Sequence, residues 1–278
     1  MKFGGIVSPV DLRDYRFNFL DLLHMKFPAE YEVEMKHNIK KQQAESCTSN
    51  ATATILEHFD NNRYVLSTSF IYGIKHKLFG DEGTGETVRN ALETVKNYGD
   101  VKYAFCPGDL EVDEVYELAE KSFNNEKHMK DAYKHKIKSY VRLRSKKSIK
   151  YALMNYGPII VCTKWYNKYT LNKITGNLVF DKKSSIFYHS FVIYGWNDFG
   201  WKCQNSWGVG WGKSGLFNIP YDFKLNDIFA LIDDKSLDSL TEDVKIIKPG
   251  KWNTFVNNVI KLINKIINKT KNMINAWA

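Results

Sequence analysis

Apolar residues recur at helical spacing in the first half of this chain. Ala51, Ile55 and Phe59 follow Cys47 at intervals of four, so these side chains share one face of a helix. The sequence therefore predicts a helix that opens near Cys47 and buries this face. Three further helices, with Ser or Thr near their starts or Gly after their ends, are predicted over residues 67–79, 87–98 and 145–156.

The second half of the chain changes character. Its apolar residues fall in short continuous or alternating runs bounded by Gly, Asn, Asp and Pro, which predicts strands over residues 159–163, 188–194, 201–204 and 216–219. Helices followed by strands favour an α+β fold with two subdomains. We expect a cleft between them, with Cys47 on one wall and His189 on the other.

These patterns divide the chain into three parts. Residues 1–36 lack clean periodicity and are interpreted as an N-terminal arm packed on a surface. The main domain spans residues 37–235, with a helical lobe over about 37–156 and a β-rich lobe over about 157–235. Within the helical lobe the charged stretch 109–136 is expected to be an exposed helical excursion. Residues 236–278 form a separate tail.

Composition narrows the class of protein. The chain has 278 residues, 44% hydrophobic content and a net charge of +9, which suits a globular protein. No CxxC pair occurs, which argues against a zinc or redox motif, and the four cysteines lie far apart: Cys47, Cys106, Cys162 and Cys203. Cys162 lies in an apolar run and is expected to be a buried reduced thiol, typical of a reducing compartment.

No targeting or spanning segment is recognised in the sequence. The N-terminus lacks the apolar core of a signal peptide, and no run reaches the roughly 18 apolar residues of a transmembrane helix. A bias towards Lys, Asn and Ile indicates an AT-rich viral or bacterial genome. We therefore expect a cytoplasmic or virion-associated protein.

Three short stretches carry the parts needed for thiolate acyl chemistry. A Cys, a His and an Asn follow one another as Cys47, His189 and Asn205, the order of a nucleophile, a base and an orienting group. Cys47 is expected in the first turn of its helix, where the helix dipole and a neighbouring imidazolium lower a thiol pKa. Each residue alone also fits a structural role: Cys47 as a small buried side chain, and His189 as a buried histidine with satisfied hydrogen bonds.

The stretch around Asn205 is the most specific of the three. It reads Asn-Ser-Trp-Gly-Val-Gly-Trp-Gly over 205–212. A Trp packed over an Asn–His hydrogen bond would shield that bond from water and fix the imidazole tautomer. The alternative is a Gly- and Trp-rich turn in a hydrophobic core.

With these residues the chain resembles the papain family of cysteine peptidases, most closely its bacterial and viral members. The similarity runs from Asp11 to about Asp233, and the stretches that carry it are DLRDY, SCTSNA, GPI, HSFVIYGW and NSWGVGWGKSGLF. The resemblance implies a two-lobe fold with Cys47 as nucleophile, His189 as base and acid, and Asn205 as orienter. It implies no metal or cofactor.

The loop before the nucleophile departs from the family pattern. The family has a Gln six residues before the Cys, whose amide contributes to the oxyanion hole, but that position is Lys41 here. A one-residue deletion in the loop would keep Gln42 as the donor, with Gln43 as the second candidate. Glu45 replaces a Gly and could narrow or charge the cleft. Without a donor the rate would fall roughly 10²–10³-fold.

The resemblance also suggests where a substrate binds. Gly83 and Gly85 lie where the family pairs its glycines with the substrate backbone, although a flexible connector is the alternative interpretation. Trp207 is assigned to the same substrate-binding group. The arm has two interpretations: either the enzyme is synthesised in an active form, or the arm covers the cleft.

The tail has its own pattern. Apolar residues recur at alternating spacings of four and three between Trp252 and Trp277, and no acidic residue follows Asp243. This predicts a basic amphipathic helix. It could pack back on the domain, bind a protein partner or self-associate through residues 251–277, or bind an anionic membrane surface. Nucleic-acid binding is disfavoured.

The sequence therefore predicts a cysteine endopeptidase that acts on polypeptides through an acyl-enzyme. The alternative from another class is a papain-fold structural or binding protein with a weakened site, tethered by its tail. A second enzymatic alternative cleaves isopeptide or ubiquitin-like linkages. The residues do not identify the natural substrate or the oligomeric state.

Overall fold

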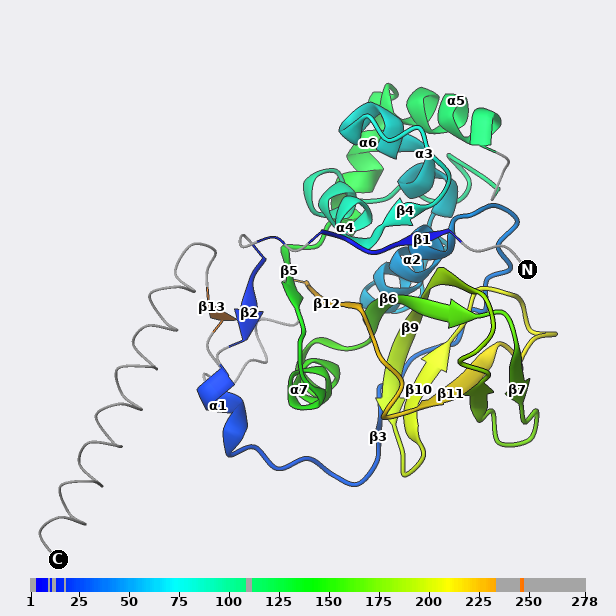
Figure 1. Ribbon diagram of the computed structural model, residues 1–278. Helices are drawn as coiled ribbons and strands as arrows, with labels where there is room; N and C mark the ends of the chain where they lie inside the picture. The colour runs from blue at the N-terminus through cyan, green and yellow to red at the C-terminus, as the bar shows by residue number, and fades with distance from the viewer. Residues whose placement is uncertain are drawn as a thin grey trace, which may run out of the picture.

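The computed structural model describes residues 4–9, 11, 14–17, 19–108, 112–233 and 246–247. Figure 1 shows a group of helices at one end of the molecule and a large sheet at the other, with α2 between them. The predicted α+β architecture with a helical half and a β-rich half is confirmed. The predicted tail helix lies outside the described residues.

The large sheet combines strands that lie far apart in the sequence. Its order is β11-β10-β9-β6-β12-β5, with β3 also paired to β9, and all these pairs are antiparallel. The strands are β3 (Tyr31–Glu32), β5 (Ser139–Arg142), β6 (Ile159–Tyr166), β9 (Ile186–Trp196), β10 (Gly200–Gln204), β11 (Leu216–Pro220) and β12 (Asp227–Ile232). A separate hairpin joins β7 (Tyr169–Leu171) and β8 (Leu178–Phe180).

The helices begin at the expected caps. Side-chain oxygens of Ser67, Thr87 and Ser145 each accept a hydrogen bond from a backbone N–H three residues later, and left-handed Gly80 ends one helix. The helices are α1 (Phe19–Leu23), α2 (Cys47–Phe59), α3 (Thr68–Phe79), α4 (Val88–Asn97), α5 (Val112–Phe123), α6 (Glu126–Ala132), the 3₁₀ turn η1 (Tyr133–His135) and α7 (Lys146–Tyr156).

Helix α2 joins the two halves. Its apolar face packs on β6 and β9, so that Ile55 shares one buried cluster with Ile160 and Val192. A second cluster lies within the β-rich half around Trp165 and Phe217. This packing fixes the position of Cys47, the first residue of α2, relative to the sheet.

The stretch expected to be an exposed excursion is packed instead. Helix α5 lies against α3, where Val115 and Ala119 are buried. The two helices approach closely at Gly73 of α3, where a Cβ would overlap the carbonyl oxygen of Val115. The charged residues that suggested exposure occupy the outer face of α5.

The arm is fixed at two places along its length. Strand β1 (Gly5–Ile6) pairs in parallel with β4 (Glu86–Thr87), and β2 (Arg16–Phe17) pairs with β13 (Ile246–Ile247). Figure 1 shows β1 running between the helical group and the sheet, beside α2. Within the described residues, no helix has the length and apolar character that crossing a membrane requires.

Candidate active site

Cys47 is the first residue of α2, and it faces β9. The backbone N–H of Ser190 donates a hydrogen bond to Cys47 Sγ at 3.3 Å. The Thr48 and Ser190 hydroxyls lie 2.8 Å apart, which ties the first turn of α2 to the same strand. Because Ser190 follows His189, these contacts bring the predicted nucleophile and the predicted base to one place.

The imidazole of His189 is held on several sides. Its Nε2 lies 2.8 Å from Asn205 Oδ1, so the Asn carboxamide accepts a hydrogen bond from the ring N–H. The Trp207 ring stacks on the imidazole with centroids 4.5 Å apart, and Trp165 meets it edge-on at 5.1 Å. All four side chains are buried. The arrangement fixes the orientation of the ring and keeps water away from the His–Asn bond.

Gln42 lies beside the strand end that carries Asn205. Its backbone N–H donates to the Ser206 carbonyl at 2.8 Å, and its amide oxygen accepts from the Ser206 hydroxyl at 2.6 Å. Its amide nitrogen donates to the Ala44 carbonyl at 3.0 Å. Gln43 is exposed, whereas Gln42 is buried. The structure therefore places Gln42, and not Gln43, in the wall next to Asn205.

The two glycines predicted to bind substrate each form a hydrogen bond with a side chain of α3. The carbonyl of Gly83 accepts from the fully buried Lys75 ammonium at 2.5 Å, and the N–H of Gly85 donates to the Tyr72 hydroxyl at 3.2 Å. Gly85 has a φ of +82°, which favours glycine. Its Cα faces Gly4 of the arm.

The arm covers this site. A Cβ on Gly4 would overlap the carbonyl oxygen of Glu45, and a Cβ on Gly5 would lie 2.7 Å from Cys162 Sγ and 3.1 Å from Ser190 Oγ. The side chains of Cys47 and His189 are 0% exposed. The arm therefore fills the space above the thiol.

This covering reverses the expected pKa of the thiol. Burial raises the pKa of Cys47 to about 11, although hydrogen bonds from Ser190 and the Gly4 backbone oppose the shift. Burial likewise lowers the pKa of His189 to about 4, against the effect of Asn205. The sequence had predicted a lowered thiol pKa. That prediction was wrong for the covered site, because it took the cleft to be open to water.

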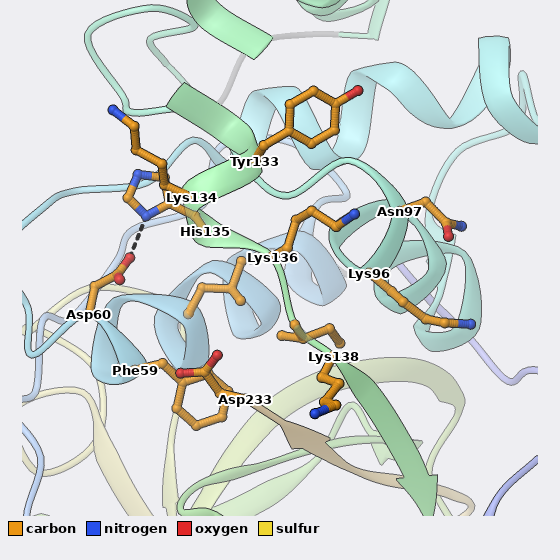
Figure 2. A pocket seen from close by; sticks show the side chains of 12 residues that line it. Phe59, Asp60, Lys96, Asn97, Tyr133, Lys134, His135, Lys136, Lys138 and Asp233 are labelled. Atoms are coloured by element: carbon orange, nitrogen blue, oxygen red, sulfur yellow. Dashed lines mark hydrogen bonds and ion pairs between the residues drawn. The ribbon is translucent and has the colours of Figure 1, made fainter. Parts of the chain in front are cut away.

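A larger hollow lies elsewhere on the molecule. It has a volume of about 730 Å³ and lies between η1, α4 and the end of α2 (Figure 2). Lys96, Lys136 and Tyr133 line it, and His135 Nδ1 lies 2.5 Å from Asp60 Oδ2. None of the predicted catalytic residues lines this hollow.

Several residues that shape the site were missed by the sequence analysis. Trp165 lies in β6 far from any motif, and Glu86 is fully buried beneath α2, where Ser49 Oγ donates to Glu86 Oε2 at 2.5 Å. Ser190 occupies the position of an Ala in the family pattern HAVxxVGY, and this difference was a usable signal. Trp165 and Glu86 carry no comparable local signal, because their roles depend on partners from distant segments.

Known proteins resemble this chain in sequence and in fold. A sequence profile described as papain family cysteine protease matches residues 28–228. An uncharacterized peptidase C1-like protein of Acanthamoeba polyphaga mimivirus is 26% identical over 210 residues, which are 66% of this chain. The matched part spans 64% of that relative's length.

Solved structures share the fold at low sequence identity. Xylellain, a cysteine protease from Xylella fastidiosa, superposes with a TM-score of 0.70 at 22% identity, covering 83% of this chain and 96% of its own. Digestive procathepsin L 3 of Tenebrio molitor larval midgut gives 0.55 at 16% identity, covering 76% and 71%. The profile spans most of the chain and the fold is shared, so this chain belongs to the papain family of cysteine proteases.

Proposed function

We propose that this protein is a cysteine endopeptidase whose site is Cys47, His189 and Asn205. The observation that carries the proposal is the meeting of α2 and β9, where Cys47 Sγ accepts the Ser190 N–H beside the imidazole that Asn205 holds at 2.8 Å. A thiol at a helix start, next to an oriented imidazole, is an arrangement that supports nucleophilic catalysis.

The chemistry divides into two acyl transfers. The Cys47 sulfur, having given its proton to His189, attacks the peptide carbonyl carbon and forms a C–S bond. The C–N bond then breaks as His189 returns the proton to the leaving amine. In the second half, His189 removes a proton from water, the hydroxide attacks the thioester carbonyl, and the C–S bond breaks to release the acid and the thiol.

Two donors are proposed for the oxyanion. The backbone N–H of Cys47 belongs to the first turn of α2, where N–H groups lack partners within the helix. The side-chain NH₂ group of Gln42 is the second proposed donor. The Ser206 hydroxyl holds its amide oxygen, and its amide nitrogen donates to the carbonyl of Ala44, three residues before Cys47.

The substrate is proposed to bind as an extended chain along the wall formed by residues 83–86. Glu86 and Thr87 belong to the main-chain edge with which the arm pairs, and the substrate is proposed to use the same edge. Trp207 is proposed to border the leaving-group side of the cleft, because it stacks on His189. Neither of the two acyl transfers needs a metal or a cofactor.

The test is covalent labelling combined with hydrolysis. The full chain is treated with an epoxide-type thiol inhibitor, and the modified residue is mapped by mass spectrometry. Hydrolysis of a fluorogenic peptide panel is followed in parallel. We expect modification at Cys47 and hydrolysis that the inhibitor abolishes and that Cys47→Ala lacks. A folded protein with no modification at Cys47 and no hydrolysis, even in a variant that lacks residues 1–9, would contradict the proposal.

A papain-fold binding protein is the second candidate. Lys41 at the usual oxyanion position and the bond from Gln42 to Ala44 favour it. It predicts that Cys47 reacts with the inhibitor but that no peptide is hydrolysed. Cleavage of isopeptide-linked substrates alone, in the same panel, would favour the second enzymatic alternative.

We also propose what the tail binds. Residues 251–277 lie outside the described residues, and their sequence predicts a basic amphipathic helix. We propose a protein partner or self-association there, with an anionic membrane surface as the alternative.

A further inference from the structure

We propose that the hollow between α4, η1 and the end of α2 is a docking site for an acidic peptide segment of a partner protein. The hollow has a volume of about 730 Å³ and is here called the basic hollow, because four lysines line it: Lys96, Lys134, Lys136 and Lys138. Three features carry the inference: the apolar part of the wall, the surplus of positive charge, and the spacing of the lysines. The inference goes beyond the proposed peptidase activity and does not depend on it.

The wall of the basic hollow is partly apolar. Leu56 and Ile137, each 2% exposed, line it together with the partly buried ring of Phe59. Tyr133 adds a second ring to the wall, and this ring is 52% exposed. A hollow of this size falls within the roughly 300–1,000 Å³ of ligand pockets, and the apolar part of its wall suits a hydrophobic side chain of the ligand.

Positive charge exceeds negative charge around the basic hollow. Two aspartates, Asp60 and Asp233, line it beside its four lysines. The Asp60 carboxylate is bound to His135, whose Nδ1 lies 2.5 Å from Asp60 Oδ2, as Figure 2 shows. Lys136 forms no ion pair within the part of the chain that the structure describes, and its ammonium lies 5.5 Å from the centre of the Tyr133 ring. An anionic ligand can therefore pair with Lys136.

Lys134 offers a second positive charge to a ligand. Its side chain is 66% exposed, and its acidic partner among the described residues is Asp131, whose Oδ1 lies 3.7 Å from Lys134 Nζ. The same oxygen accepts a hydrogen bond from Lys102 Nζ at 2.9 Å. Because such an exposed and shared ion pair contributes little, Lys134 can turn to an anionic ligand at small cost.

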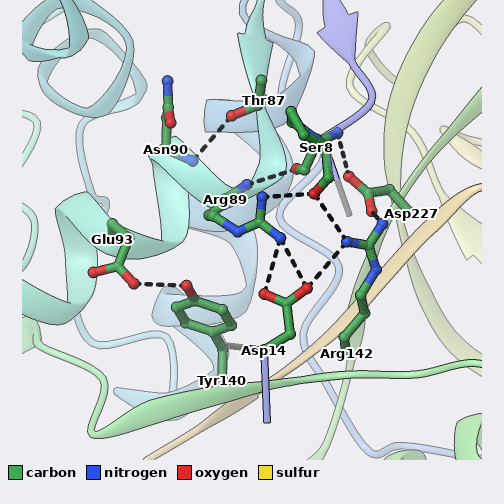
Figure 3. Close-up of polar contacts among 10 residues, drawn as sticks. Ser8, Asp14, Thr87, Arg89, Asn90, Glu93, Tyr140, Arg142 and Asp227 are labelled. Atoms are coloured by element: carbon green, nitrogen blue, oxygen red, sulfur yellow. Dashed lines mark hydrogen bonds and ion pairs between the residues drawn. The ribbon is translucent and has the colours of Figure 1, made fainter. Parts of the chain in front are cut away.

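A neighbouring hollow has a different arrangement of charge. Its volume is about 580 Å³, and Lys96 lines both hollows. Its acidic and basic residues bind each other, as Figure 3 shows: Asp14 accepts two hydrogen bonds from Arg89 Nη2, at 2.9 and 2.8 Å. Glu93 accepts a hydrogen bond from the Tyr140 hydroxyl at 2.6 Å. Because these groups are already paired, the neighbouring hollow offers less charge to a ligand than the basic hollow does.

The spacing of the lysines suits an extended peptide. Lys136 and Lys138 are exposed and Ile137 between them is buried, so the two lysines project to one side of the chain. In an extended chain, side chains two residues apart are about 6.6 Å from each other. A peptide in which acidic and apolar residues alternate repeats its carboxylates at this interval and can bring an apolar side chain to Phe59 or Tyr133. The geometry therefore favours an acidic peptide over a flat anionic membrane, which does not enter a hollow.

The basic hollow lies away from the proposed catalytic site. Cys47 begins α2 and Phe59 ends it, so the two residues are separated by about 18 Å along the helix axis. A peptide bound beside Phe59 therefore leaves Cys47 untouched. Binding at the basic hollow and chemistry at Cys47 can be measured separately.

The experiment measures by fluorescence anisotropy the binding of a fluorescein-labelled peptide in which Asp alternates with Leu. The parent protein is the full chain carrying Cys47→Ala, so that the proposed peptidase activity cannot consume the probe. In the charge variant, Lys134→Gln is combined with Lys136→Gln, which removes positive charge from the basic hollow. In the filling variant, Asn97→Trp places an indole ring in the hollow without changing its charge, since Asn97 is the exposed last residue of α4.

The matched control combines Lys173→Gln with Lys182→Gln. Lys173 is an exposed residue between β7 and β8, and the side chain of Lys182 is 64% exposed, so this pair removes the same charge from a different surface. A peptide with Asn in place of every Asp is the control for the probe.

We expect Kd to rise at least about fivefold in the charge variant, because two charge pairs with the peptide are lost. The filling variant should bind the peptide at least as weakly, and the matched control should change Kd by less than about twofold. The Asn peptide should bind the parent far more weakly than the Asp peptide does. Thermal unfolding at the parent's midpoint shows that each variant is folded. If Asn97→Trp fails this check, the comparison between the two lysine pairs decides.

An equal loss of binding in the matched control would overturn the docking site, because it would reduce the interaction to the net positive charge of the chain. Unchanged binding in folded Asn97→Trp would overturn it as well. A single-stranded oligodeoxynucleotide that displaces the peptide and binds more tightly would assign the basic hollow to nucleic acid instead. The endopeptidase is tested by labelling at Cys47, which uses none of the hollow variants, so either proposal can fail without the other.

Discussion

At the residue scale, Gln42 and Gln43 are neighbours with different surroundings. Gln42 is buried and bound to Ser206 and Ala44, whereas Gln43 is exposed. We predict that Gln42→Ala lowers kcat roughly 10²–10³-fold, because the oxyanion loses a donor. KM should change little, since the oxyanion forms only in the transition state. Steady-state kinetics check this, with Gln43→Ala as the control. A comparable loss of kcat in Gln43→Ala would show that the role does not belong to Gln42.

Glu86 gives the site a pH-dependent stability. Burial raises the pKa of Glu86 from 4.5 to about 8, although Ser49 and Lys75 oppose the shift and Asp81 adds to it. Below pH 4.5 the folded and unfolded states both hold the proton. As the pH rises from 4.5 to 8, the unfolded chain releases it first, so stability is lost across this window.

We therefore predict that Glu86→Gln gains stability relative to the wild type as the pH rises from 5 to 8. Each unit of pKa shift corresponds to about 1.4 kcal/mol, so the change should be on the order of a few kcal/mol. Urea unfolding at several pH values measures it. A difference between the two proteins that stays constant with pH would show that Glu86 ionises normally in the fold.

Single residues differ in how far the sequence could predict them. Cys47, His189 and Asn205 each lie in an unbroken local pattern that names both the residue type and its neighbours. Glu86 could not be predicted, because an acidic residue in a polar loop normally faces water. Its burial follows from α2 passing above it, which is a property of the assembled fold.

At the scale of elements, the helices and strands follow the sequence closely. The predicted helix from Cys47 matches α2, and the strand predicted over 188–194 lies within β9. Periodicity determines which face of an element is apolar, but not which distant segment covers it. The crossing of the arm over Cys47 depends on close approaches at Gly4 and Gly5, so no periodic signal could reveal it.

Helix α2 is also tied to the loop that carries Gln42. Glu57, 1% exposed, accepts from Lys40 Nζ at 2.6 Å and from the Leu66 N–H at 2.9 Å. We predict that Glu57→Ala destabilises the fold by about 2–4 kcal/mol, because Lys40, whose side chain is 11% exposed, loses its partner and the buried Leu66 N–H loses its acceptor. Thermal unfolding measures this. Asp222→Ala, which removes an exposed ion pair, is the control and should unfold like the wild type.

At the scale of the whole molecule, the described hydrophobic clusters draw their residues from distant parts of the chain. Their members run from Phe17 to Ile232, and the described part beyond them is the short strand β13. The rest of the tail, from residue 248 onward, lies outside the described residues. Its three interpretations, packing on the domain, association and membrane binding, predict different consequences of removing it.

We predict that deletion of residues 251–278, which leaves β13 in place, preserves folding and peptide hydrolysis but removes association. The physical reason is the unopposed positive charge and the apolar stripe of residues 251–277, which favour binding to a partner surface. Sedimentation and binding to vesicles with and without anionic lipid distinguish self-association from membrane binding. A fall in the unfolding midpoint of more than a few degrees, with no change in either assay, would instead mean that the tail packs on its own domain.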